Sequence, residues 1–184
     1  MNVEKINAAS STTSDVSCSV ASSEVANASG IYTATCYDAD GNLKWTDTYT
    51  NLVTTAGKND LLDKYIAGSG YTAAWYLGLV DGGSSPTYAV ADTMSSHAGW
   101  TENTGYTEAN RVTPSWNAAA AGSKASNATS FSINATSTIS GTFLVSDNTK
   151  SGTAGILYSA GNFTGGDKSV ASGDTLNVTY TASV

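Results

Sequence analysis

The segment IYTATCYDADGNLKWTDTY, residues 31–49, decides the fold of this chain. Its first part, 31–37, and its last part, 43–49, are rich in Thr, Tyr and other residues that favour strands. The residues between them, 38–42, have turn chemistry, and Asp-Gly between two such runs is a strong hairpin signal. The segment therefore predicts an antiparallel β-hairpin.

Further strands are predicted towards the C-terminus. Residues 71–80, YTAAWYLGLV, are typical of a largely buried strand, and apolar residues alternate within 131–135 and 139–145. Residues 156–158 and 175–180 complete the pattern, which amounts to roughly seven or eight strands separated by turn residues. We expect a mainly β protein, an antiparallel β-sandwich.

One short α-helix is expected near residues 59–67. Asn59 suits the N-cap position, and Gly68 suits the C-terminal cap. The apolar residues that indicate the helix fall on one stripe, at Leu61, Leu62, Tyr65 and Ile66.

The chain divides into two parts by composition. Residues 1–28 are rich in Ser, Ala and Thr and are expected to form an N-terminal arm or an edge strand. Residues 29–184 are expected to form a single β-sandwich domain. Within it, residues 86–130 are interpreted as a long loop region pinned by aromatic side chains, which ends in an exposed connector at 118–127.

Charge and hydropathy exclude several classes of function. Only 12% of the 184 residues are charged, so the solvent face of the sheets is expected to consist of hydroxyls and amides. The net charge is −7, with one arginine and dispersed lysines, so direct nucleic-acid binding is not expected. No stretch approaches the ~18 apolar residues of a membrane helix, and the N-terminus lacks the apolar core of a secretory signal. We expect synthesis in a cytoplasm and no membrane partner.

No catalytic, cofactor-binding or metal-binding residues are predicted. His97 is the single histidine, no Gly-x-Ser-x-Gly motif precedes it, and it has no neighbouring zinc ligands. With Asp92 and Glu102 on either side, it is interpreted as a residue that locks the loop. Cys18 and Cys36 are expected to be free thiols, although a disulfide between adjacent strands stays open.

Three aromatic residues in the loop region are candidates for an interaction or glycan platform: Trp100, Tyr106 and Trp116. They leave open a carbohydrate-binding module as an alternative function. A polysaccharide-degrading enzyme that uses Glu102 is a further alternative, although no second carboxylate is marked out as its partner.

Five segments of the chain resemble uncharacterised virion structural proteins of tailed bacteriophages. They are YDADGNLKW at 37–45, NLV at 51–53, GKNDLLDKY at 57–65, AWYLGL at 74–79 and DTMSSHAGW at 92–100. The resemblance extends over about residues 30–116 and, more loosely, to the C-terminal strands. These are framework motifs rather than active-site motifs.

The resemblance implies a structural part of a phage particle. The first expectation is a capsid decoration or cement protein that binds the major capsid protein or other virion proteins, as a homodimer or homotrimer. The alternative is a tail or tail-fibre component that takes part in host attachment or glycan binding. In both cases the protein belongs to the virion, assembled in the host bacterial cytoplasm.

Overall fold

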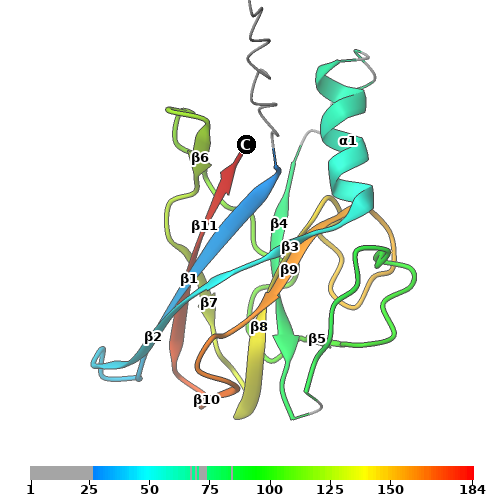
Figure 1. Cartoon of the computed structure of the whole chain (residues 1–184). Helices are drawn as coiled ribbons and strands as arrows, with labels where there is room; N and C mark the ends of the chain where they lie inside the picture. The colour runs from blue at the N-terminus through cyan, green and yellow to red at the C-terminus, as the bar shows by residue number, and fades with distance from the viewer. Residues whose placement is uncertain (1–26, 67, 69, 71–73, 84) are drawn as a thin grey trace, which may run out of the picture.

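The computed structural model of the chain describes residues 27–184 except 67, 69, 71–73 and 84. The predicted arm therefore lies almost wholly outside the described residues. Two antiparallel sheets pack face to face, and one helix stands at one end of them (Figure 1). The mainly β, sandwich-like fold predicted from the sequence is confirmed.

The first sheet contains β1 (Ser29–Tyr37), β2 (Leu43–Thr50), β6 (Ser123–Ala125), β7 (Thr129–Ser132) and β11 (Thr175–Ser183). The second contains β3 (Leu52–Val53), β4 (Tyr76–Asp81), β5 (Glu102–Asn103), β8 (Ser137–Val145), β9 (Leu157–Asn162) and β10 (Lys168–Val170). Their orders are β2-β1-β11-β6, with β7 also on β11, and β3-β9-β8-β4-β5, with β10 also on β8.

The described residues thus hold eleven strands rather than seven or eight. The additional ones are short, since β3 and β5 contain two residues each and β6 and β10 three each. A strand of this length has no room for the apolar–polar alternation that identifies a strand in a sequence.

The hairpin predicted at residues 31–49 is formed by β1 and β2. In its turn, Asp38 Oδ1 accepts hydrogen bonds from the backbone N–H of Asp40 at 3.0 Å and of Asn42 at 2.8 Å. Gly41 has a φ of +84°, a conformation that glycine adopts without steric cost. The local chemistry of 38–42 is therefore sufficient to place the turn.

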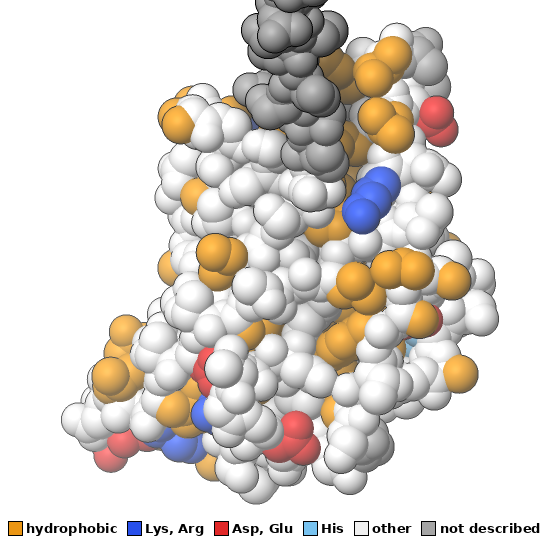
Figure 2. Space-filling view, in the orientation of Figure 1, with side chains coloured by type: hydrophobic (Ala, Val, Ile, Leu, Met, Phe, Trp, Pro, Cys, Tyr) orange, Lys and Arg blue, Asp and Glu red, His pale blue; other side chains and the backbone are white. Residues whose placement is uncertain are grey.

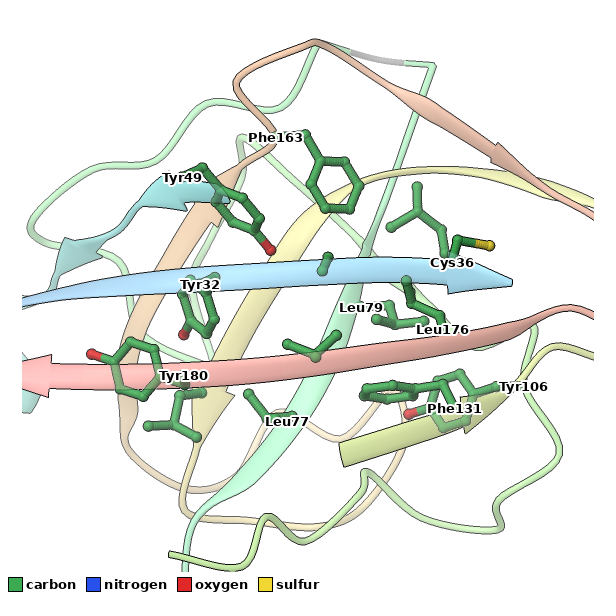
Figure 3. Packing of buried hydrophobic residues seen from close by; sticks show 14 of the residues in the cluster. Tyr32, Cys36, Tyr49, Leu77, Leu79, Tyr106, Phe131, Phe163, Leu176 and Tyr180 are labelled. Atoms are coloured by element: carbon green, nitrogen blue, oxygen red, sulfur yellow. The ribbon is translucent and has the colours of Figure 1, made fainter. Parts of the chain in front are cut away.

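The main core lies between the sheets and is rich in tyrosine (Figure 3). The rings of Tyr32 on β1 and Tyr180 on β11 lie 4.5 Å apart, and neither residue is exposed. The Tyr32 hydroxyl reaches across to the second sheet and shares a 2.7 Å hydrogen bond with Ser159 Oγ. This hydrogen bond between the two sheets helps to fix how they face each other.

A second, smaller core covers the outer face of the second sheet. Residues of the long loop, including Met94 and Trp100, pack there against Val80, Phe143 and Val145. This explains why β4 and β8 are buried on both faces. The predicted loop region 86–130 is therefore part of the packed structure, and it also contains β5, β6 and the first two residues of β7.

Hydroxyl groups pair across the outer face of the first sheet, in line with the low charge content. Thr33 and Thr48 form a cross-strand pair, with 3.0 Å between their Oγ1 atoms, and Thr46 Oγ1 donates to Thr35 Oγ1 at 3.3 Å. Such pairs stabilise a sheet without charge.

The predicted helix exists as α1 (Thr55–Tyr65), but it begins before Asn59. Thr54 is the N-cap, because its hydroxyl accepts a 3.0 Å hydrogen bond from the backbone N–H of Gly57. A Cβ on Gly57 would lie 2.6 Å from the carbonyl oxygen of Tyr158, so the helix meets β9 backbone to backbone. The assignment of Asn59 as N-cap is thus wrong, since the preceding Thr-Thr-Ala-Gly already forms the first turn.

The apolar stripe that indicated the helix does not face the core. Gly57 and Asp60 are the buried residues of α1, whereas Tyr65 is 88% exposed and Ile66, its C-cap, 75% exposed. Figure 2 shows hydrophobic side chains on the surface of this part of the molecule. The helix is held by its N-terminal half and presents apolar side chains to solvent.

Candidate functional site

A cavity of about 400 Å³ lies at the end of the sandwich beside α1. Side chains from both sheets, from α1 and from the loops before β4 and β6 line it. Its volume falls in the range of small-molecule sites in proteins, and such sites have mostly apolar walls. The main apolar wall residues are Trp75, Pro114, Trp116, Leu144, Tyr158 and Tyr180.

Four aromatic rings of this wall form a continuous series of edge-to-face contacts. The rings of Trp75 and Tyr158 are 5.3 Å apart at 68°, and those of Tyr158 and Tyr180 are 6.5 Å apart at 75°. Trp116 then contacts Tyr180 at 6.3 Å and 82°. Because each ring stands steeply against the next, the series presents both ring faces and ring edges to the cavity.

Backbone pairing holds these rings in place. Trp116 forms an isolated β-bridge with Ser126, whose backbone N–H donates to the carbonyl of Tyr180 at 2.8 Å. The Ser126 hydroxyl in turn accepts from the backbone N–H of Tyr180 at 3.0 Å. Tyr158 lies on β9 of the second sheet and Tyr180 on β11 of the first, so strands from both sheets contribute to one wall.

Three charged residues also line the cavity: Asp60 and Lys64 from α1, and Lys124 from β6. Lys64 Nζ lies 3.6 Å from Asp60 Oδ1, and Lys124 Nζ donates to the carbonyl oxygen of Asn117 at 2.9 Å. Two lysines face one aspartate, so this site is locally positive in a chain of net charge −7.

The cavity wall is suited to binding rather than to proton transfer. Burial raises the pKa of Tyr158 above its ordinary value. Burial also raises the pKa of Tyr180, whose hydroxyl accepts a 2.9 Å hydrogen bond from Asn51 Nδ2. Both phenols therefore stay protonated near neutral pH, and neither is an activated base or nucleophile.

The predicted aromatic platform is wrong for two of its three members. Trp100 is 3% exposed and Tyr106 is 1% exposed, because each fills a packed space rather than the surface. Trp100 belongs to the second core, and Tyr106 packs edge-to-face on Phe131 at 5.0 Å. Trp116 is half-buried and lines the cavity.

His97 and Asp92 both contact Trp100. The His97 ring stacks on the Trp100 ring at 4.0 Å, and its Nδ1 lies 3.1 Å from the Trp100 carbonyl oxygen. Asp92 Oδ2 accepts from Trp100 Nε1 at 3.3 Å and from the backbone N–H of Ala89 at 3.0 Å. Both residues thus contact the loop itself, at the Trp100 ring that packs on Phe143 of the second sheet.

Glu102 acts on the loop through Arg111 rather than through His97. Its carboxylate accepts from Arg111 Nε at 3.0 Å and Nη2 at 2.8 Å, and Oε2 also accepts from the backbone N–H of Ser151 at 2.8 Å. A cavity of about 270 Å³ lies between His97 and Glu102. Because both carboxylate oxygens are engaged, Glu102 offers that cavity no free base.

The described residues contain no group of three or more His, Cys, Asp or Glu arranged to hold a metal ion. Nor does any helix in the described ranges have the length and apolarity to cross a bilayer. Cys36 is buried, with its Sγ 3.8 Å from Asp174 Oδ2. Cys36 is a free thiol in the structure, and Cys18 lies outside the described residues.

Neither a known protein family nor a curated protein matches this chain.

Sequence reasoning missed most of the cavity wall. Trp75, Tyr158 and Tyr180 come from segments that were correctly interpreted as strands or strand neighbours, but nothing local distinguishes a tyrosine at a sandwich end from one in the core. Arg111 stands out in the sequence only as the single arginine. Its isolation in a chain with dispersed lysines was a usable signal, because arginine is the preferred cation for buried ion pairs.

Proposed function

We propose that this chain is a non-enzymatic structural subunit of a tailed-bacteriophage particle, most specifically a capsid decoration protein. It attaches to the major capsid protein, or to a neighbouring virion protein, as a homo-oligomer. The resemblance of residues 30–116 to phage virion proteins supports the setting, and the sandwich with two packed cores supports a structural role.

One observation carries the attachment step: the exposed apolar end of α1. Leu62, Tyr65 and Ile66 are 52%, 88% and 75% exposed, and they lie within one turn of each other. Contiguous apolar side chains at a projecting end of a protein mark an interaction surface. Aromatic residues such as Tyr65 commonly anchor interfaces because they bury much area for little loss of conformational entropy.

Assembly of capsids tests the proposal. Capsids produced without this protein are expected to lose resistance to heat or low salt, and purified protein added back is expected to restore it. The double variant Tyr65→Ser/Ile66→Ser should fold normally yet bind such capsids about thirtyfold more weakly, since loss of an interface anchor costs about 2 kcal/mol.

A matched control is Leu43→Ser, which removes an apolar side chain that is 61% exposed at the β1–β2 turn, far from α1 along the hairpin. It should bind like the wild type. Capsids that are equally stable without the protein, together with particles that no longer adsorb to the host, would instead support a tail component. The glycan-platform version of that alternative is weakened, since Trp100 and Tyr106 are buried.

A further inference from the structure

The cavity beside α1 has no role in the attachment proposed above, and it carries an inference that is independent of it. The proposed contact surface lies on the exposed residues of α1, whereas the cavity lies between the sheets and the inner side of that helix. Leu61 of α1 contributes to the cavity wall and is not part of the proposed contact surface. The cavity is therefore a separate site.

The walls determine the body of the ligand. Trp75, Trp116, Tyr158 and Tyr180 offer ring faces and edges, and Leu144 and Pro114 add aliphatic surface. Binding in such a space gains most from burial of apolar area. A volume of about 400 Å³ accommodates a single aromatic ring or a short branched alkyl group with its substituents.

The charged residues determine the polar end of the ligand. Lys64 and Lys124 approach the cavity from α1 and from β6. Asp60 is the acidic residue of the lining, and Lys64 lies 3.6 Å from it. The sum of the three charges is positive, which favours a ligand with a negative group and disfavours a cation, although the aromatic walls alone would tolerate one.

Three other cations in the described part of the chain are paired with carboxylates. Lys44 pairs with Asp174, Lys168 with Asp47 and Arg111 with Glu102. Lys124 differs from these, because the partner of its ammonium is a backbone carbonyl rather than a carboxylate. Its charge is therefore available to an anion without the loss of an ion pair.

We infer that this cavity binds a small apolar carboxylate, with the apolar part between the four aromatic rings and the carboxylate at Lys64 and Lys124. No chemical step is implied. The site is a binding site for a molecule such as an aryl- or alkyl-substituted short-chain acid.

Three related probes test the inference on the full chain: 3-phenylpropionate, 3-phenylpropionamide and 3-phenylpropylammonium. They share the phenyl group and differ in charge. Titration by calorimetry, with tryptophan fluorescence as a second readout, is expected to give saturable one-to-one binding of the carboxylate. The amide should bind roughly two- to fivefold more weakly, because a partly exposed ion pair contributes up to about 1 kcal/mol. The ammonium should bind most weakly.

Variants separate the two halves of the site. Lys64→Gln/Lys124→Gln should lower carboxylate affinity to that of the amide and leave amide binding unchanged. Trp116→Ala should weaken both probes alike. Lys58→Gln is the matched control, since Lys58 is an exposed lysine of α1 outside the cavity lining. Circular dichroism and the unfolding midpoint establish that each variant is folded.

Four results would overturn the inference: no saturation at millimolar probe, equal affinity for all three probes, tightest binding of the ammonium, or a carboxylate preference that survives the double lysine substitution. Tightest binding of the ammonium would identify the four aromatic rings as a site for organic cations instead.

Discussion

Arg111 and Glu102 form a bidentate ion pair away from solvent, with 3.0 Å between Nε and Oε1 and 2.8 Å between Nη2 and Oε2. Their side chains are 0% and 5% exposed. Arg111 also donates to the carbonyl oxygens of Asp147 at 3.0 Å and Gly152 at 2.8 Å. One side chain thus ties the long loop to the segment between β8 and β9, and its guanidinium lies 5.2 Å from the centre of the Phe143 ring.

Loss of either partner should destabilise the protein strongly. Arg111→Met leaves the Glu102 carboxylate buried without its cation, and Glu102→Leu leaves the guanidinium without its anion. Each variant is expected to lose about 3–5 kcal/mol in the free energy of unfolding, measured by urea titration. The double variant should lose clearly less than the sum of the two, by about 1–3 kcal/mol, because no fully buried charge is left unpaired. Strict additivity would show that the two residues act separately.

The carboxylate of Asp174 makes stability depend on pH on the acid side. Burial by itself would raise its pKa, but hydrogen bonds from Lys44 and from the backbone N–H of Ala171 outweigh burial, so the pKa lies below the ordinary value of 3.8. The carboxylate of Asp174 therefore takes up a proton less readily in the folded protein than in the unfolded chain. The stability that the ionised carboxylate contributes is complete above the ordinary pKa and is lost as the pH falls through the pKa of the folded state.

Asp174→Asn should accordingly be less stable than the wild type near neutral pH, and the difference should shrink as the pH is lowered below about 4. Urea unfolding over a pH series measures this. Asp63→Asn is the control, because it makes the same substitution at an exposed carboxylate of α1 and should not cause the loss of stability near neutral pH. A wild-type profile that runs parallel to that of Asp174→Asn at all pH values would contradict the assignment.

The parts of the fold that depend on neighbours in sequence were predictable. The β1–β2 hairpin follows from Asp38 and Gly41 in one short turn, and the existence of α1 follows from the spacing of its apolar residues. The direction in which these apolar residues of α1 point could not be predicted from the sequence. The helix packs against β9 through Gly57, which has no side chain to indicate a contact. The cavity could not be predicted either, since Trp75 and Tyr180 are far apart in sequence and line one cavity only when the two sheets pack together.

Trp100 is expected to matter for stability and not for glycan binding. It is 3% exposed, lies 5.0 Å from Phe143 and stacks on His97. Trp100→Ala should cost about 3–5 kcal/mol, the usual range for a buried aromatic residue. Trp116→Ala, which truncates a half-buried ring, should cost less. A surface role for Trp100 would be indicated instead by an unfolding free energy within about 0.5 kcal/mol of the wild type.

The connector at 118–127, expected to be an exposed linker, is a tight hairpin that can be stabilised. The backbone N–H groups of Ala120 and Ser123 donate to each other's carbonyl oxygens at 2.9 and 3.0 Å, and the two residues between them have positive φ, +50° at Ala121 and +73° at Gly122. Two central residues with positive φ define the turn type in which Asn-Gly is preferred. Alanine is poorly suited to the first position, because its Cβ crowds the backbone in the left-handed conformation.

Ala121→Asn should therefore raise the free energy of unfolding by about 0.4–1 kcal/mol, a gain comparable to other substitutions that suit the native backbone angles. A more stable turn should also stabilise the first sheet, because β6 follows this turn and pairs with β11 at the C-terminal end of the chain. Ala119→Asn serves as the matched control: it introduces the same side chain at an exposed position without positive φ and should bring no gain. If both substitutions stabilise the protein equally, the effect arises from asparagine at the surface and not from the turn.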